Sequence, residues 1–286
     1  MPSSLSSPLI DVLSAESFAA EHVPGAFNFC AYETAFADKI RVAFPDTATE
    51  LTVCGYCDDT QEAELAVAKL KDAGYQHVKV MPGGLKAWKA GGGSLEGDGP
   101  HASEATGQFP VDPNESFIHW TGRNLFNFHT GSLRLADGFV KIEGGELKAA
   151  EFTIDMNSLG CSDLTDHTMN GMLIAHLRSG DFFKVDEYPV ATFVLSSASA
   201  IEGATAGLPN QRITGDLTVR GITKRITFDA LVAEKGKGIF VAQAVFEIDR
   251  TEWGSIYGSG RFFARLGQHV VNDKVHLHLK VVTRPE

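Results

Sequence analysis

The sequence predicts two domains of different class, an α/β domain with a parallel sheet flanked by helices and then an antiparallel β-barrel. The chain has 286 residues, and a domain takes roughly 100–200. Strand and helix patterns alternate before residue 95, whereas period-two strand patterns fill the chain after residue 110. Between them, five of residues 91–100 are glycine, which is typical of a flexible linker. We therefore place the domains at residues 1–95 and 111–286, with a Gly-rich linker at 96–110.

The first domain alternates apolar runs with helical patterns. Ser14 is expected to cap a helix at 15–22, and apolar residues at 3–4 spacing predict a second helix at 62–73, followed by a short one at 85–90. Strands are expected at residues 8–13, 51–56 and 77–81. This alternation predicts βαβ units and parallel strands, and ligands in such sheets bind at the carboxyl ends of the strands.

The second domain contains recurring short segments in which apolar residues have a period of two. Phe152, Ile154 and Met156 alternate with Thr153 and Asp155. Similar runs occupy residues 213–219, 226–230, 240–248 and 275–281. Period two over many strands predicts an antiparallel sheet with one buried face, and about eight such strands close into a barrel. A helical stretch at 169–177 interrupts the strands and is expected to cap one end of the barrel.

Composition narrows the classes of partner. The sequence is 43% hydrophobic and 21% charged, with a net charge of −11, which argues against nucleic acids and anionic membrane surfaces as partners. No apolar run approaches the ~18 residues of a membrane helix, and the N-terminus lacks the pattern of a signal peptide. We expect a cytoplasmic protein without membrane insertion, and a homodimer stays open.

The four cysteines, Cys30, Cys54, Cys57 and Cys161, are too few for a disulfide framework. Cys57 follows a predicted strand and precedes a predicted helix, where backbone amides stabilise a thiolate or a bound sulfur anion. It is therefore the candidate catalytic residue, against the alternative of a small buried apolar side chain. Cys54 and Cys57 also match a C-x-x-C redox motif, but a disulfide there would bend the strand.

Two groups of residues frame this region. The first is Ile10-Asp11-Val12 with His22-Val23-Pro24-Gly25-Ala26-Phe27-Asn28, and the second is Gly74-Tyr75, residues 78–81, Gly83-Gly84 and Trp88. Over residues 8–92 they resemble the single-domain rhodaneses, with Cys57 at the spacing of that family's catalytic cysteine. The resemblance implies a cysteine that accepts sulfane sulfur as a persulfide, with a sulfur donor or acceptor protein as partner.

The candidate active-site loop after Cys57 differs from the rhodanese pattern, which commonly has basic residues and a glycine. Here it consists of Asp58, Asp59, Thr60, Gln61 and Glu62. Carboxylates near a thiolate raise its pKa and repel thiosulfate-like donors. A protein-persulfide relay, a phosphatase-like relic and a docking module all stay open.

The second domain carries a longer set of motifs. They are Val111-Asp112-Pro113, residues 116–122, Phe128-His129-Thr130-Gly131, residues 152–156, residues 176–179 with 181–183, Tyr188-Pro189, residues 191–193, 215–218, 220–224 and 249–254. Over residues 111–283 they resemble the YceI-like domains. The resemblance implies a lipocalin-like barrel that holds a polyprenoid or another long-chain lipid.

An interior that binds lipid would be lined by the large apolar side chains of the strands. Our candidate lining residues are Phe152, Ile154, Met156, Phe193, Phe228 and Phe246. We expect no cofactor apart from a bound polyprenoid or fatty acid. The alternative is a barrel that its own side chains fill.

Polar residues of the second domain receive no catalytic role. His276 and His278 share the strand face opposite the apolar one, so we expect solvated histidines and no metal site. Two ion pairs, Arg178 with Asp181 and Asp249 with Arg250, are expected at the barrel rim.

Two functions follow. The first is a lipid-binding barrel coupled to a rhodanese-like domain. The second is an active sulfurtransferase that works as a persulfide relay through Cys57, with the barrel as an accessory or sensor.

Overall fold

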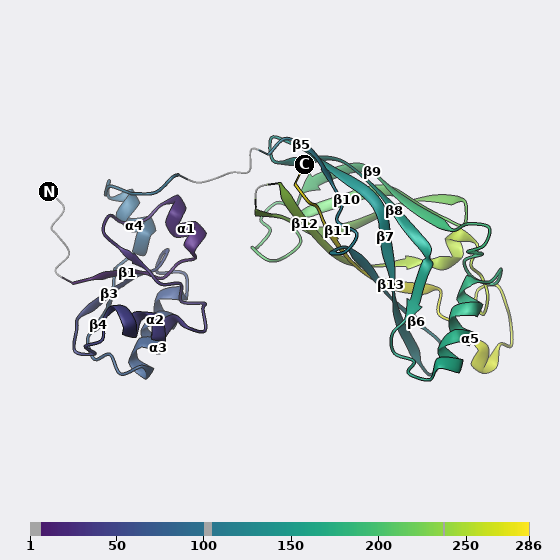
Figure 1. The fold of residues 1–286 in the computed structure, drawn as a ribbon, viewed down its shortest axis with the longest axis horizontal. Helices are drawn as coiled ribbons and strands as arrows, with labels where there is room; N and C mark the ends of the chain where they lie inside the picture. Colours follow the sequence, from purple (N-terminus) through teal and green to yellow (C-terminus); the bar gives the residue numbers. More distant parts are fainter. Residues whose placement is uncertain (1–6, 100–104, 237, 286) are drawn as a thin grey trace. The chain divides into compact units, whose positions relative to one another are not determined.

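The computed structural model describes residues 7–99, 105–236 and 238–285. The chain divides into two compact units at residues 1–102 and 103–286, and each unit is described by itself. Both predicted fold classes are confirmed. The first unit is a parallel α/β sheet, and the second is an antiparallel barrel (Figure 1).

The first unit is a four-stranded parallel sheet in the order β2-β1-β3-β4. Helices α1 and α4 lie on one face, and α2 and α3 lie on the other (Figure 1). Its elements are β1 (Leu9–Asp11), α1 (Ala15–Ala20), β2 (Phe27–Asn28), α2 (Phe36–Ala43), β3 (Leu51–Cys54), α3 (Glu62–Asp72), β4 (Val78–Val80) and α4 (Gly84–Ala90).

Apolar side chains bury both faces of this sheet. Phe36 and Ile40 of α2 pack with Ala66 and Leu70 of α3 under β1 and β3, while Leu85 of α4 packs in a second cluster on the other face. Ser14 caps α1 as predicted, because its hydroxyl accepts a hydrogen bond from the amide of Ser17.

Sequence reasoning did not predict β2 and α2, and it placed the end of α1 too late. The helix ends at Ala20 because Glu21 is extended, and His22 forms an isolated bridge with Glu96. The bridge also shortens the predicted linker at 96–110. The amides of Asp98 and Gly99 donate to the carbonyls of Ala19 and Ala20, each at 2.8 Å.

The described residues of the second unit form nine strands, of which eight close into a barrel because β7 pairs with both β6 and β8. The strands are β5 (Gly107–Pro110), β6 (Phe117–Arg123), β7 (Phe128–Glu143), β8 (Glu146–Cys161), β9 (Val190–Ala200), β10 (Gln211–Val219), β11 (Ile222–Gly236), β12 (Ile239–Asp249) and β13 (Lys274–Val282). Strand β5 adds to β7, so the C-terminal end of the predicted linker belongs to the sheet. The middle of the linker, residues 100–104, lies outside the described residues.

One α-helix, α5 (His167–Arg178), interrupts the strands of the second unit, close to its predicted place. Asp166 caps it by accepting a hydrogen bond from the amide of Met169 at 2.9 Å. Two short 3-10 helices, η1 (Arg250–Trp253) and η2 (Gly267–His269), lie in the segment between β12 and β13. Among the described residues, no helix combines the length and the apolar character needed to cross a membrane.

Candidate functional site

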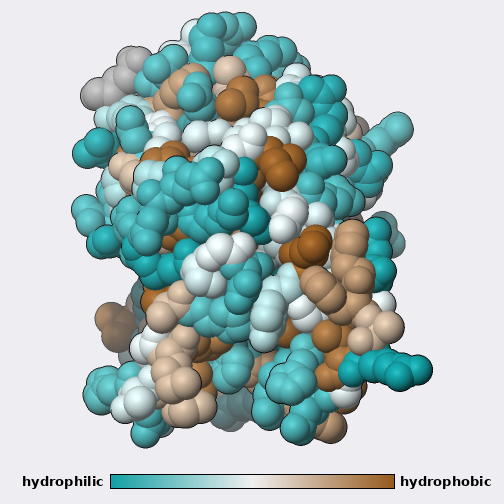
Figure 2. All heavy atoms as spheres, turned by 90° about the vertical axis from the view of Figure 1, so that its right-hand side faces the viewer, coloured by the Kyte–Doolittle hydropathy of each residue, from teal (hydrophilic) through white to brown (hydrophobic). Residues whose placement is uncertain are grey.

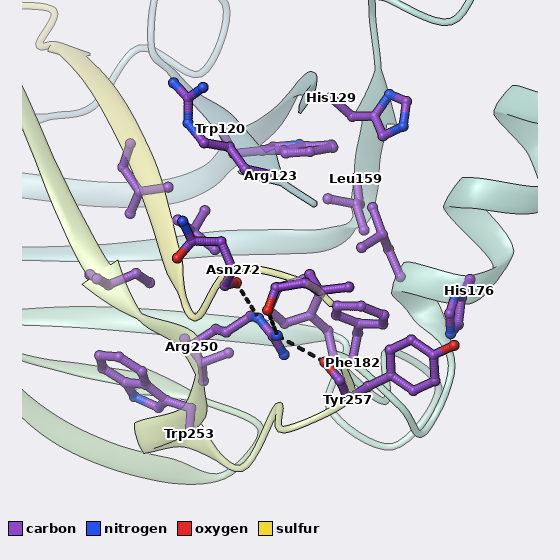
Figure 3. A pocket seen from close by; sticks show the side chains of 18 of the residues that line it. Trp120, Arg123, His129, Leu159, His176, Phe182, Arg250, Trp253, Tyr257 and Asn272 are labelled. Carbon is purple, nitrogen blue, oxygen red and sulfur yellow. Dashed lines mark hydrogen bonds between the residues drawn. The ribbon is translucent and has the colours of Figure 1, made fainter. Parts of the chain in front are cut away.

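The barrel interior contains an apolar cavity of about 360 Å³ at the end that carries α5 (Figure 3). This volume lies within the range of small-molecule sites. Its wall consists mainly of inward-facing strand residues together with side chains from α5 and from the segment between β12 and β13. Apolar members of the wall include Ile118, Trp120, Leu133, Ile154, Met156, Leu159, Leu173, Leu177, Phe182, Phe183, Ala191, Leu217, Val219, Ile248, Trp253, Val275 and Leu277.

Five polar wall residues lie where the cavity meets solvent, while Arg250, which also lines the cavity, is buried. Arg123, Asn124, Gln268, His269 and Asn272 line the cavity and are all exposed. The deep wall is apolar, since Ile154, Ala191 and Leu217 are buried. A ligand with an apolar chain and a polar end therefore matches the order of the wall from inside to outside.

Helix α5 contributes one face to the cavity because Leu173, His176 and Leu177 are three and four residues apart. The His176 ring meets the edges of Phe182 and Tyr257, with centroid distances of 5.0 and 4.7 Å. Its Nε2 lies 3.1 Å from the carboxylate of Asp181. This aromatic cluster fixes the helix against the segment between β12 and β13 (Figure 3).

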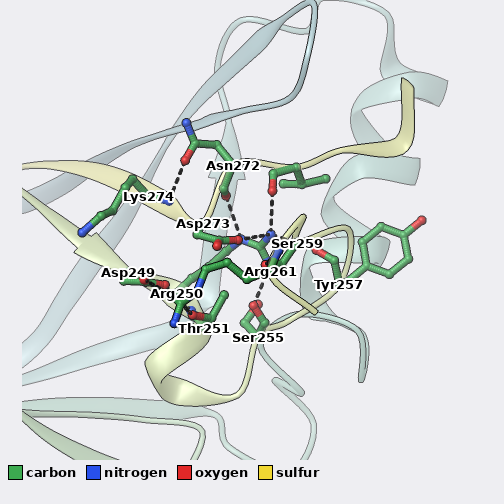
Figure 4. Close-up of polar contacts among 11 residues, drawn as sticks. Asp249, Arg250, Thr251, Ser255, Tyr257, Ser259, Arg261, Asn272, Asp273 and Lys274 are labelled. Atoms are coloured by element: carbon green, nitrogen blue, oxygen red, sulfur yellow. Dashed lines mark hydrogen bonds and ion pairs between the residues drawn. The ribbon is translucent and has the colours of Figure 1, made fainter. Parts of the chain in front are cut away.

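A buried arginine holds that segment in place. The Arg250 guanidinium donates to the carbonyls of Asn272 at 2.9 Å, Tyr257 at 2.8 Å and Val271 at 3.1 Å, and also to that of Ser255 (Figure 4). It lies 5.4 Å from the Phe182 ring centroid. Burial lowers the pKa of Arg250, and the carboxylate of Asp273 at 3.7 Å opposes that shift.

The two predicted ion pairs have different partners in the structure. Asp249 pairs with Arg261 at 2.7 Å, because Arg250 points inward to the carbonyls instead. Arg178 binds the side chain of Asn157 at 2.9 Å and lies 3.6 Å from Asp186, since Asp181 is taken by His176.

A layer of four phenylalanines lies beyond the deep end of this cavity. Phe152 stacks on Phe193 with a centroid distance of 6.1 Å, Phe193 meets Phe228 at 5.9 Å, and Phe228 stacks on Phe246 at 4.2 Å. Gly215 makes room for the layer, because a Cβ there would lie 2.3 Å from the Phe193 ring. On the other side is a smaller cavity of about 50 Å³, and no described residue lines both.

The six predicted lipid-lining residues therefore divide between two levels of the barrel. Ile154 and Met156 line the larger cavity. Phe152, Phe193 and Phe228 line the smaller one, and Phe246 lines neither but packs against the core. The sequence shows which face a side chain takes, but not its depth along the barrel.

Several lining residues escaped prediction although their signals were present. Ile118, Trp120 and Gly122 alternate on β6 with the period of an inward face. The sequence also shows the i, i+3, i+4 spacing of Leu173, His176 and Leu177 on α5. The lining by residues 268–272 had no periodic signal, since this segment is not a strand.

One group of side chains of metal-ligand type lies at the end of the barrel that carries α5. The ligand atoms of His129, Cys161 and Asp163 lie within 4.8 Å of one another. His129 Nδ1 lies 2.9 Å from Asp163, and the Cys161 thiol lies 3.2 Å from it. Burial works to raise the pKa of Asp163, but hydrogen bonds from the Thr130 amide, His129 and Cys161 outweigh it and lower the pKa to about 2. The three side chains thus satisfy one another.

His276 and His278 follow the outward face of β13, while Leu277 and Leu279 pack toward the core. In the register of β13 with β6, His276 lies opposite Thr121 and His278 lies opposite His119, with the two histidine ring centroids 6.3 Å apart.

Cys57 lies three residues beyond β3, at the carboxyl edge of the parallel sheet, and is partly exposed. Its Sγ is 3.8 Å from the Thr60 hydroxyl, and its amide donates to the same hydroxyl at 3.3 Å. Gln61 is the N-cap residue of α3 but makes no capping hydrogen bond through its side chain, and Asp59 is exposed. All four cysteines are free thiols.

Carboxylates of the loop occupy backbone amides near Cys57. Glu62, which is buried, accepts from the amide of Tyr56 at 2.7 Å, and Asp58 accepts from the amide of Gly83 at 2.8 Å. Amides of this kind are what would hold an anionic sulfur donor. Two of them are engaged by the protein's own acids, so the loop is poorly suited to thiosulfate-like anions.

Two further titratable groups lie under the loop. Asp11 is fully buried, and its burial raises its pKa to about 6. Burial also raises the pKa of Cys54 to about 12, helped by the charges of Asp11 and Glu62. Cys54 is therefore an inert thiol, unlike the partly exposed Cys57.

Two family models match the chain. The YceI-like domain covers residues 109–283, and the rhodanese-like domain covers residues 2–91.

Individual relatives match part of the chain. A UPF0312 protein of Pseudomonas putida is 30% identical over 123 residues, which are 43% of this chain and 59% of that protein, so less than two thirds of the relative is covered. The crystal structure of Burkholderia cenocepacia BcnA is 25% identical over 61% of this chain and 99% of its own, with a TM-score of 0.48. A polyisoprenoid binding domain from Saccharophagus degradans is 16% identical over 64% of this chain and all of its own, with a TM-score of 0.45.

Proposed function

Because the chain belongs to the YceI-like family and carries a rhodanese-like domain before the barrel, we propose that the barrel binds a long-chain lipid, an isoprenoid or a fatty acid. The observation that carries the proposal is the cavity of about 360 Å³ with apolar deep walls and a polar mouth. The lipid chain would occupy the deep part, and its polar end would lie at the mouth.

The cavity supplies enough apolar contact for binding. Removing on the order of 300 Å² of ligand surface from water contributes about 7 kcal/mol at 25 cal/mol per Å². Association and ordering of the ligand offset part of this gain. Trp120, which lines the cavity, adds a polar contact, since its buried Nε1 has no acceptor among the described residues. A ligand oxygen accepting from it would relieve the cost of an unpaired buried donor.

Blocking the cavity tests the proposal. Gly122 lines it, and a Cβ there would meet only Trp120, at 3.8 Å. Gly122→Phe therefore adds a ring to the cavity without a clash at its first atom. The matched control is Gly236→Phe, at the end of β11, where a Cβ would meet nothing within 4 Å.

The assay is displacement of a fluorescent fatty acid by farnesol, geranylgeraniol and palmitate from the full chain. We expect saturable binding that Gly122→Phe weakens at least about tenfold and Gly236→Phe leaves unchanged. Binding that Gly122→Phe does not alter, or the absence of saturable binding by wild type, would overturn the proposal.

A second function is supported by the position of Cys57. A partly exposed thiol at the carboxyl edge of the sheet, before α3, can accept sulfur from a protein persulfide, which needs no bound anion. In that step the thiolate attacks the outer sulfur of the donor persulfide, and the donor leaves as its thiolate. Mass spectrometry after exposure to a persulfidated donor protein should show about +32 Da on Cys57, absent from Cys57→Ser. An unmodified Cys57 rejects this second function.

A further inference from the structure

Two segments form the exposed rim of the cavity mouth. Residues 123–129 span the turn between β6 and β7 together with the strand ends beside it, and residues 254–273 connect η1 to β13. They are adjacent, because Asn124 bridges to Val271 and the Asn272 amide donates to the Arg123 carbonyl at 2.9 Å. Both segments also line the cavity. We call residues 123–129 and 254–273 together the mouth rim.

The mouth rim exposes large apolar side chains. Phe126 is 72% exposed, Leu125 56%, Phe128 55%, Phe262 52% and Phe263 45%. Figure 2 views the side of the barrel that carries α5, where hydrophobic side chains reach the surface between polar ones. Grouped exposure of this kind marks a surface that binds a partner.

The charge of the mouth rim is opposite to that of the whole chain. The chain has a net charge of −11, yet the mouth rim contains three arginines and a single acid, Asp273, whose side chain is 16% exposed and lies 3.7 Å from Arg250. Arg261 pairs with Asp249, while Arg123 and Arg265 make no ion pair among the described residues. On the barrel wall, by contrast, Arg212 and Arg225 are each paired across strands with an aspartate.

Arginine and phenylalanine also stand together on both segments. Arg123 lies 5.6 Å from the Phe128 ring centroid, and Arg261 lies 5.6 Å from that of Phe262. An arginine beside an exposed ring suits the boundary of an anionic bilayer, where the guanidinium meets phosphate and the ring enters the acyl region. The acidic remainder of the chain would be repelled, which leaves this side as the one that can face the bilayer.

We propose that the mouth rim docks on the surface of an anionic bilayer and so opens the cavity toward membrane lipid. Docking gives an apolar ligand a path that avoids water. That docking serves ligand exchange rests on the proposed function, whereas docking of the mouth rim on the bilayer does not. Docking can fail in a protein that still binds farnesol, and binding can fail in one that still docks.

Co-sedimentation of the full chain with vesicles tests the inference. The vesicles are phosphatidylcholine alone, and phosphatidylcholine mixed with phosphatidylglycerol. We expect sedimentation with the mixed vesicles at about 0.1 M salt, a marked loss at about 1 M salt, and little with phosphatidylcholine alone.

Rim variants carry the decisive comparison. Each arginine near an anionic surface contributes about fivefold to partitioning, so Arg123→Glu with Arg265→Glu should lower it at least about 25-fold. Phe126→Ser should lower it about tenfold. The matched controls are Arg134→Glu and Val245→Ser on the barrel wall, where Arg134 is an exposed residue and Val245 is 72% exposed.

Far-UV circular dichroism and the thermal unfolding midpoint of the same variants show whether they fold. No sedimentation by wild type, or equal losses in rim and control variants, would overturn the inference. Self-association that the rim variants abolish would also overturn it, because a second copy would then cover this surface.

Discussion

Phe193 belongs to the phenylalanine layer beyond the larger cavity and lines the smaller one. Its removal should lengthen the ligand that the barrel accepts. Phe193 is 8% exposed and touches the rings of both Phe152 and Phe228. Phe193→Ala removes this ring from the middle of the layer. The larger cavity of about 360 Å³ and the smaller one of about 50 Å³ would then join through the vacated space.

The cost and the gain can be estimated separately. Truncation of a buried phenylalanine destabilises by about 3–5 kcal/mol, and the loss of two ring contacts places Phe193→Ala in the upper part of that range. For the ligand, each additional buried carbon contributes about 0.8 kcal/mol. One isoprene unit admitted to the joined cavity could therefore add up to about 4 kcal/mol, and we expect at least a tenfold effect.

The assay compares farnesol with geranylgeraniol, which differ by one isoprene unit, in the displacement of the fluorescent fatty acid. The affinity ratio of the longer to the shorter alcohol should rise at least about tenfold in Phe193→Ala. Phe240→Ala is the control, because Phe240 is buried to a similar degree, at 5% exposed, but its ring contacts Phe109 and is not part of the phenylalanine layer. A ratio in Phe193→Ala equal to those of wild type and Phe240→Ala would refute the role of the phenylalanine layer.

Three further predictions follow from buried groups. Burial raises the pKa of Asp11 in the folded protein from 3.8 to about 6, so its protonated form stabilises the fold below pH 3.8, and about 3 kcal/mol of stability is lost as the pH rises through 6. The urea midpoints of β1 and β3, measured by pulsed hydrogen exchange at a fixed pulse pH, should fall over this pH range in wild type and not in Asp11→Asn. Arg250→Met leaves four carbonyls without their donor and should cost about 3–5 kcal/mol in thermal unfolding, whereas an equal effect of Arg212→Met would contradict the special role of Arg250. Gly84→Ala would place a Cβ 2.4 Å from the Gly55 carbonyl at a φ of +56° and should lower the free energy of unfolding by at least about 2 kcal/mol. Gly25→Ala should lower it less, because a Cβ there meets nothing within 4 Å. Equal thermal unfolding midpoints for the two variants would contradict this steric argument.

Much of the fold was predictable because local patterns carry it. Ser14 is a hydrogen-bonding cap before a helix, and apolar residues recur with period two along much of β8, β12 and β13. By contrast, β2 has only two residues. It exists because Ile10 and Asp11 of β1 pair with it, and such a tertiary contact leaves no local period to read.

The cavity was only partly predictable, because period two fixes the face of a side chain and not its level. Phe152 and Ile154 share the inner face of β8, yet two residues along a strand are about 7 Å apart. That distance places Phe152 at the smaller cavity and Ile154 at the larger one. The level depends on the stagger of all eight strands, which follows from closure of the barrel.

Arg250 shows a second limit of sequence reasoning. Next to Asp249, it indicates a local ion pair, but its guanidinium turns toward carbonyls of residues 255–272. Since Arg261 replaces it at Asp249, both partners are satisfied by residues outside the dipeptide. Partners of this kind become visible only once the loop is folded.

Native mass spectrometry of the delipidated full chain, reloaded with geranylgeraniol, tests the central claim most directly. The account predicts one bound lipid per chain in wild type, a bound lipid in Gly236→Phe, and none in Gly122→Phe, whose added ring fills the cavity. If wild type retains no lipid, or if Gly122→Phe retains as much as wild type, the cavity is not the binding site.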